Sequence, residues 1–394
     1  MSRAGWLIAA VLFARASHSA GLPAPDRLAA EGFDHFYNLE YDQALADFQK
    51  EASVYPDSPE AFNHIAQTVI FRALYKAGAL DTGFVADSNP FFHRPPMPMS
   101  AADRKLVEDS LARSMDLSGA RLKRNPKDIG ALYAMGVAHG LRADDAFLIK
   151  KAWIEALREV TAERKLHAKV LEIDPGIADA RLIEGLHDYI VGSLVFPWKM
   201  IGFVAGFHGN KQTGIQTLKL VAEQAKENRV DAAIILEAIL RREHRPAEAL
   251  PFITNLAGRY PRNFLFRLER VQLYGDMGDK TKALAEISAI ERLKRTDAPG
   301  YDKLSEAKIH FVRGSLLFRF GDLDQALEEL KLADGSGGID HRSSAVAWLH
   351  TGQIYDLKRQ RQPADAAYRE AMRAFPHSDI SSQAKHYISS GYTR

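Results

Sequence analysis

The C-terminal half of the chain repeats one pattern of small and large residues about every 34 positions, as between Ala249 and Ala283. Small residues allow two helices to cross closely, and neighbouring aromatic rings fill the space beside the crossing. Such a unit is a helical hairpin that buries its apolar face only by stacking on the next copy. The last copy is the most complete, with Trp348, Gly352, Tyr355, Ala364, Tyr368, Ala371 and Pro376 in order.

Four further copies share this frame with fewer matching residues. They contain Gly314, Gly321, Ala326, Leu330 and Ala333; Tyr274, Gly278 and Ala283; Ala249 and Pro261; and Gly32, Tyr41, Ala44, Phe48 and Pro56. In the first of them along the chain, Glu51 stands where a small residue is usual. The pattern resembles tetratricopeptide repeats (TPRs) and predicts an all-α fold, a TPR-like superhelix of antiparallel helical hairpins.

The repeats and the segments between them predict five regions. In the central region we expect one helix over 128–141, a single long helix over 145–173 and a new helix over 178–193. The regions are a signal peptide at 1–20, an N-terminal TPR-like repeat at 21–80, an irregular loop at 81–100, central TPR-like helices with extended hairpins at 101–228, and a TPR array at 229–394.

The first twenty residues are typical of a secretory signal peptide. Arg3 precedes the apolar run 5–14, and cleavage is expected after Ala16 or Ser19. The chain contains no cysteine, which excludes disulfides, thiolate zinc sites and a lipid-modified bacterial N-terminus. We therefore expect a periplasmic or secreted protein of a bacterial envelope, and an uncleaved membrane anchor is the alternative.

Net charge argues against nucleic acid as a partner. Lys and Arg total 52 against 50 Asp and Glu, so the chain has no overall field that would attract a polyanion. The nearly uncharged segment 189–207 approaches the length of a membrane span, but Pro197 interrupts it, and we expect a buried hairpin rather than a membrane contact. Together with the aromatic loop 81–100 it could instead line a pocket for a small molecule or lipid, which is the alternative function.

The middle of the chain carries a second resemblance. Gly192–Ser193–Leu194, Pro197, the run 205–211 and Gly214 are similar to the central motif of the tetratricopeptide repeat protein 39 and inclusion-body-clearance family. The resemblance covers about the middle third of the chain and implies a non-enzymatic adaptor. The expected signal peptide departs from that family, so its intracellular roles are not carried over.

Catalytic motifs are absent from the sequence. The fourteen histidines form no His–Glu–x–x–His motif, and no phosphate-binding glycine loop or Gly–x–Ser–x–Gly elbow occurs. We therefore expect no enzyme activity, no cofactor and no metal.

The first helix of each hairpin is expected to line the concave groove that binds a protein or peptide. Arg241, Arg242, Lys308 and Arg319 are predicted to form a mildly basic stripe beside Phe311, which favours an acidic or carboxylate-ended peptide. A solvated charged face is the alternative. The candidate partner-binding residues are Arg241, Arg242, Gln272, Asp276, Lys308, Phe311, Ser315, Arg319 and Gln353, flanked by Leu268, Phe318, Leu349 and Asp356.

Overall fold

The computed structural model describes residues 27–80, 97–193, 208–335 and 338–394. These residues form helices and turns with no β-strand among them, which confirms the all-α prediction. The predicted signal peptide, most of the loop 81–100 and most of the apolar segment 189–207 lie outside the described residues.

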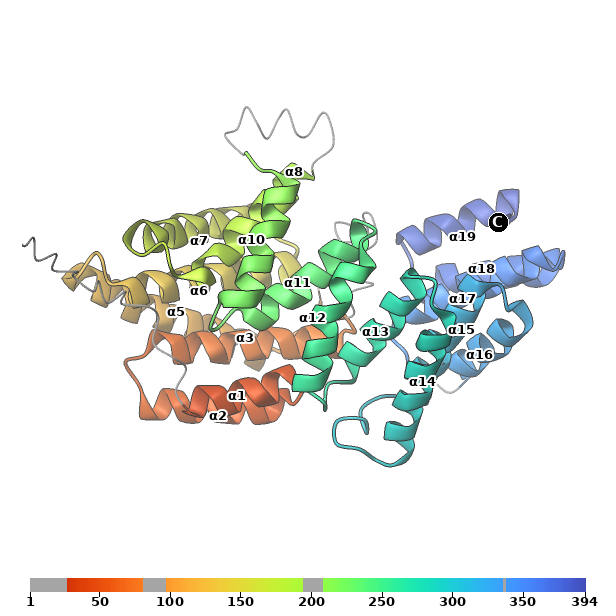
Figure 1. Cartoon of the computed structure of the whole chain (residues 1–394), viewed down its shortest axis with the longest axis horizontal. Coiled ribbons are helices and arrows are strands. Elements are labelled where there is room, and N and C mark those ends of the chain that lie inside the picture. Colours follow the sequence, from red (N-terminus) through yellow and green to blue (C-terminus); the bar gives the residue numbers. More distant parts are fainter. Residues whose placement is uncertain (1–26, 81–96, 194–207, 336–337) are drawn as a thin grey trace, which may run out of the picture.

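The described helices pair into eight antiparallel hairpins that stack along the chain and end in one further helix (Figure 1). Each hairpin contacts the next, so the fold is a TPR-like superhelix. The hairpins are α1 (Arg27–Tyr37) with α2 (Tyr41–Val54), α3 (Pro59–Lys76) with α5 (Ala101–Arg124), α6 (Ile129–Asp144) with α7 (Trp153–Ile173), α8 (Leu182–Gly192) with α10 (Lys211–Gln224), α11 (Arg229–Arg242) with α12 (Pro246–Arg259), α13 (Phe264–Asp276) with α14 (Lys280–Arg295), α15 (Glu306–Phe320) with α16 (Leu323–Gly335), and α17 (His341–Leu357) with α18 (Arg361–Ala374), followed by α19 (Asp379–Ser390).

Glycines on the first helices set how closely the two helices of a hairpin cross. A Cβ at Gly32 would lie 2.5 Å from the Phe48 ring, and a Cβ at Gly352 would lie 2.5 Å from the Tyr368 ring. Real Cβ atoms do not approach so closely, so each glycine is the condition for its aromatic partner to pack. These are the small and large positions that the repeat predicts.

The third hairpin departs from the prediction of one helix over 145–173. A six-residue π-helical turn, η2 (Asp145–Lys150), follows α6, and Lys151 then adopts a left-handed conformation with φ 59° before α7 begins at Trp153. The Trp153 ring packs edge-on against Phe147 at 4.7 Å, across this break. The wide turn and the break therefore divide the predicted helix. A 3-10 turn, η3 (Ala178–Arg181), leads into α8, where a helix was predicted.

The first hairpin packs against the fifth and sixth hairpins, more than 190 residues further along the chain. The Asn263 side chain donates to the Tyr37 carbonyl at 2.8 Å, and the Arg262 N–H donates to Asn38 Oδ1 at 3.0 Å. The Tyr37 hydroxyl donates to Asp231 at 3.1 Å. The end of α1 and the turn after it thus join α11 and the loop between α12 and α13, and we call this set of contacts the closing junction.

Charged groups surround the closing junction. Arg262 pairs with Glu40 at 2.9 Å and with Asp34 at 2.6 Å, and Lys303 donates to the Leu39 carbonyl at 3.1 Å. One apolar core runs from Phe36 through the closing junction to α17. The first five hairpins therefore form a closed turn of the superhelix, and the later hairpins extend from it (Figure 1). Within the described residues, no helix combines the length and the apolar character needed to cross a membrane.

Candidate partner-binding surface

Side-chain caps fix where the first helices of the last hairpins begin. Asn263 Oδ1 accepts from the Leu265 N–H at 2.9 Å, Ser305 Oγ accepts from Lys308 at 3.1 Å, and Asp340 Oδ1 accepts from Ser343 at 2.9 Å. Such caps satisfy N–H groups that the helix itself leaves unpaired. The caps define the starting points of α13, α15 and α17, which carry seven of the nine candidate residues.

Arg241, in the last turn of α11, contacts three carboxylates. Its guanidinium contacts Glu269 at 3.0 Å, Asp276 at 2.9 Å and Glu237 at 3.5 Å. Burial alone would lower the pKa of Arg241, and the charges of the three carboxylates instead raise that pKa above its ordinary value. The side chain is a bridge between α11 and α13.

Asp276 continues this bridge to the next hairpin. Its second carboxylate oxygen accepts from Arg319 at the end of α15, so one carboxylate joins the ends of α11, α13 and α15. The Arg319 side chain is 44% exposed, against 9% for Arg241, so the chain of ion pairs becomes more accessible toward the C-terminus. We call Arg241, Asp276 and Arg319 the charge ladder.

Lys308 and Phe311 lie two to three turns before Arg319 on α15. The Lys308 ammonium donates to Ser343 Oγ at 3.0 Å, lies 3.6 Å from Asp340 and sits 5.2 Å from the centre of the Phe311 ring. These contacts tie α15 to the start of α17. The predicted neighbourhood of Lys308 and Phe311 is therefore present, although Phe311 itself is buried.

The remaining predicted residues divide by exposure. Arg242 is exposed, Gln272 and Ser315 are half-buried, and Gln353 is buried, with its side-chain oxygen 2.9 Å from His350 Nδ1. Leu268, Phe318 and Leu349 are buried as well. The structure thus gathers the candidates along α11, α13, α15 and α17, but several of them are packing residues.

The predicted basic stripe differs from what the structure shows. Arg241, Arg319 and Lys308 each face a carboxylate of the same array, so their positive charges are compensated within the chain. The reason is the stacking itself, which brings Glu269, Asp276 and Asp340 on neighbouring helices beside these cations. A compensated surface gives less attraction for an acidic peptide than an uncompensated stripe would.

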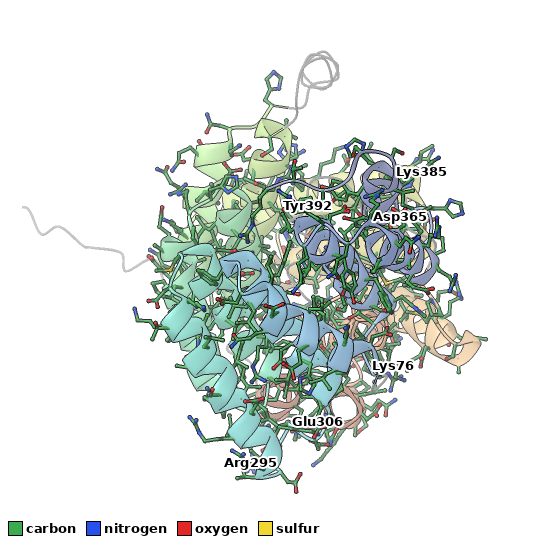
Figure 2. All side chains as sticks on the ribbon, turned by 90° about the vertical axis from the view of Figure 1, so that its right-hand side faces the viewer. Lys76, Arg295, Glu306, Asp365, Lys385 and Tyr392 are labelled. Carbon is green, nitrogen blue, oxygen red and sulfur yellow. The ribbon has the colours of Figure 1, made fainter. Side chains whose placement is uncertain are left out.

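Sequence reasoning missed the C-terminal tail, which we define as Gly391–Arg394. The tail folds back from α19 onto the ends of α15 and α17, and the Tyr392 N–H donates to Asp356 at 2.8 Å. The Arg394 guanidinium donates to the carbonyl oxygens of Phe318 and Arg319, at 2.7 Å and 3.1 Å. Figure 2 faces this end of the molecule, with Lys385 on α19 and Tyr392 on the tail labelled. In the sequence, the only sign of this tail is that Gly391 is followed by Tyr392 and Arg394.

The closed turn also contains carboxyl groups whose pKa values are raised. Burial raises the pKa of Asp144 to about 7, with further contributions from the charges of Asp231 and Asp145. Burial likewise raises the pKa of Asp231 to about 6, against the opposing effect of the Tyr37 hydroxyl, and that of Glu227 to about 7. Across the described residues, no three His, Asp or Glu side chains are grouped as metal ligands.

No protein-family model matches the sequence, and no curated protein matches it. The following solved structures have a similar arrangement and are distant in sequence. Yeast Tom70 is 13% identical, covering 92% of this chain and 94% of its own, with a TM-score of 0.42. A tetratricopeptide repeat protein from Parabacteroides merdae is 14% identical, covering 82% and 97%, with a TM-score of 0.33. YrrB, a TPR protein with an unusual peptide-binding site, is 15% identical, covering 68% and 97%, with a TM-score of 0.32.

These likenesses concern the fold alone. The assignment rests on the chain's own geometry: eight stacked antiparallel hairpins in the described residues, with glycines opposite aromatic rings at the helix crossings. On that basis the chain has a TPR-type, all-α superhelical fold.

Proposed function

We propose that this chain is a non-enzymatic TPR-type scaffold that binds a protein or peptide along the first helices of its last hairpins. The observation that carries the proposal is the charge ladder, in which three successive first helices present polar side chains as one continuous row. Solenoids use such rows on the inner wall to hold extended segments.

The ion pairs and half-buried polar side chains of this surface are better suited to binding a peptide than to catalysis. Gln272 and Ser315 are half-buried between the charged residues, so they provide amide and hydroxyl groups that bind peptide backbone without requiring one particular side chain. The concave groove and its occupant are both part of the proposal.

Crosslinked affinity capture from the native host tests this function. A double variant, Arg242→Glu with Arg319→Glu, reverses two exposed charges of the surface, while Arg295→Glu reverses an exposed charge at the end of a second helix and serves as control. We expect one reproducible partner to be retained by the control and reduced at least tenfold by the double variant. Equal capture by both variants would remove the first helices from the proposal.

We also propose that the chain works in a bacterial envelope. The proposal rests on the Arg3 and apolar run of residues 1–20 and on the absence of cysteine. N-terminal sequencing of the protein from its host tests it: a mature start at Ser17 or Ala20 supports export with cleavage. A cytoplasmic fraction that retains Met1 would contradict it. Membership of the tetratricopeptide repeat protein 39 family stays a proposal on the motif around Gly192 and Gly214.

A further inference from the structure

The C-terminal tail occupies one end of the surface just proposed for a partner. It crosses from α19 to the last turns of α17 and α15, next to the charge ladder: the Arg319 carbonyl accepts from Arg394, and the Arg319 side chain contacts Asp276. The first helices therefore already hold an extended segment at this place.

Three kinds of contact hold the tail, and they involve a backbone N–H, an aromatic ring and a guanidinium. The Asp356 carboxylate accepts from the backbone N–H of Tyr392 at 2.8 Å. The Tyr392 ring lies 5.2 Å from Tyr387, edge to face, and 6.4 Å from Phe318. The Arg394 guanidinium donates to two carbonyls at the end of α15 and lies 5.8 Å above the Phe318 ring.

The surroundings prepare this place for a cation. The last carbonyls of a helix carry partial negative charge and lack partners within the helix, so a guanidinium is a favourable donor for them. An aromatic face beneath it adds a cation–π attraction. Arg361, by contrast, pairs with Asp356 at 2.9 Å and donates to the Tyr387 carbonyl at 2.7 Å, which positions that carboxylate and holds the end of α19.

The bend into the tail depends on Gly391. Its φ of 70° is in the left-handed region, which a residue with a side chain adopts only with strain. A surface hollow of about 290 Å³ borders the tail and is lined by Asp356, Arg361 and residues 388–392. A segment longer than the tail thus has space beside it.

From these contacts we infer that the ends of α15 and α17 bind an extended partner segment in which an aromatic residue is followed two positions later by an arginine, and that the chain's own tail is the resident competitor. The inference rests on the proposed scaffold function and specifies the partner's chemistry. The tail is tethered to α19, so its effective concentration is on the order of millimolar. A partner segment of equal intrinsic affinity must exceed that concentration to displace the tail, and a tighter one needs proportionately less.

A labelled peptide tests the inference. The probe is a fluorescent Ser–Ser–Gly–Tyr–Thr–Arg peptide, the sequence of residues 389–394, and its binding is measured by fluorescence anisotropy. We expect the peptide to bind a chain truncated after Ser390 at least tenfold more tightly than the full chain. A peptide with Ala for the tyrosine and Glu for the arginine should not bind either chain.

Two further variants separate a real site from a folding defect. Full-length Arg394→Glu releases the tail without shortening the chain, so it should bind the probe as the truncated chain does. Phe318→Leu in the truncated chain keeps an apolar core residue but removes the ring, and should weaken binding at least fivefold with an unchanged circular dichroism spectrum.

Equal probe binding by the full and truncated chains, or no binding by a folded truncated chain, would overturn the inference. The scaffold function would survive that outcome, because the capture experiment with Arg242→Glu and Arg319→Glu in the full chain does not depend on the probe. Conversely, probe binding without any captured partner would retain the site and contradict the scaffold.

Discussion

The two halves of this solenoid build the same hairpin and use it differently. In the N-terminal half the first hairpin packs against the fifth and sixth through the closing junction, so the chain covers its own inner side chains. In the C-terminal half the charge ladder runs toward the end of the stack and meets a four-residue tail. Similar helical hairpins therefore produce an enclosed region and an accessible one, and the difference lies in long-range contacts.

The glycine crossings offer the largest test of this comparison. Gly32→Ala and Gly352→Ala each place a Cβ 2.5 Å from an aromatic ring, which should cost about 2–3 kcal/mol of unfolding free energy. In urea unfolding followed by hydrogen exchange, Gly352→Ala should loosen only α17 to α19, whereas Gly32→Ala should also loosen α11 to α13 across the closing junction.

Gly258→Ala is the matched control, because a Cβ there meets nothing within 4 Å. It should be neutral or stabilise α12 by up to ~1 kcal/mol, the usual gain for alanine over glycine within a helix. Destabilisation of α11 to α13 by Gly352→Ala but not by Gly32→Ala would reverse the comparison.

Cutting the closing junction is the next largest change. Asn263→Ala removes the buried hydrogen bond to the Tyr37 carbonyl and the cap of α13, and should cost about 2 kcal/mol. Asp279→Ala, which removes the exposed cap of α14, should destabilise the chain less than Asn263→Ala does. Faster hydrogen exchange in α1 and α2 should accompany the first variant alone. Exchange there that is unchanged by Asn263→Ala would show that the junction does not hold the first hairpin.

Lowering the pH should increase the folding stability of the enclosed N-terminal half, because Asp144 is there. The pKa of Asp144 is about 7 in the folded chain, because burial and then the charges of Asp231 and Asp145 disfavour ionisation, and about 4 when unfolded. The folded state therefore keeps a proton that the unfolded state releases, and stability falls as the pH rises from about 4 to about 7.

Asp144→Asn removes that loss. In urea unfolding at pH 8, the free energy of unfolding of Asp144→Asn should exceed that of the unsubstituted chain by about 1–2 kcal/mol. This difference should shrink as the pH is lowered toward 4. Asp109→Asn, at a carboxylate that is 62% exposed and paired with Lys105, should show no comparable gain. A gain for Asp144→Asn that is the same at pH 4.5 and pH 8 would assign its effect to something other than ionisation.

The charge ladder should contribute least to stability. Asp276→Asn removes the carboxylate between Arg241 and Arg319, and should cost under ~1 kcal/mol, since partly exposed ion pairs contribute little. Its effect should fall further in 1 M salt. A loss of several kcal/mol would mean that the ladder is part of the structural core rather than a surface for a partner.

Local packing was readable from the sequence and long-range packing was not. Gly352 and Tyr368 stand 16 residues apart, as do Gly32 and Phe48, and that periodic spacing predicts their contact. The contact of Asn38 with Arg262 spans 224 residues and leaves no periodic signal. The π-helical turn at 145–150 was not predicted either, because its amino-acid sequence is compatible with an ordinary α-helix.

The candidate surface was predicted in part. The repeat frame placed Arg241, Asp276 and Arg319 on successive first helices, but their pairing depends on how the hairpins twist against one another. Counting positive residues along the first helices therefore predicted a basic stripe, whereas the stacked helices compensate the charges of Arg241, Lys308 and Arg319. The tail at Tyr392 carries no repeat signal, so its docking could be seen only in three dimensions.

Native-state hydrogen exchange of the full chain tests the central claim most directly, namely that the first hairpin closes onto the fifth and sixth. Terminal hairpins of an open solenoid exchange fastest, because each contacts a single neighbour. We predict that amides of α1 and α2 are protected as strongly as those of α11 to α13, and that α18 and α19 exchange faster. Exchange in α1 and α2 as fast as in α18 and α19 would contradict the closed turn.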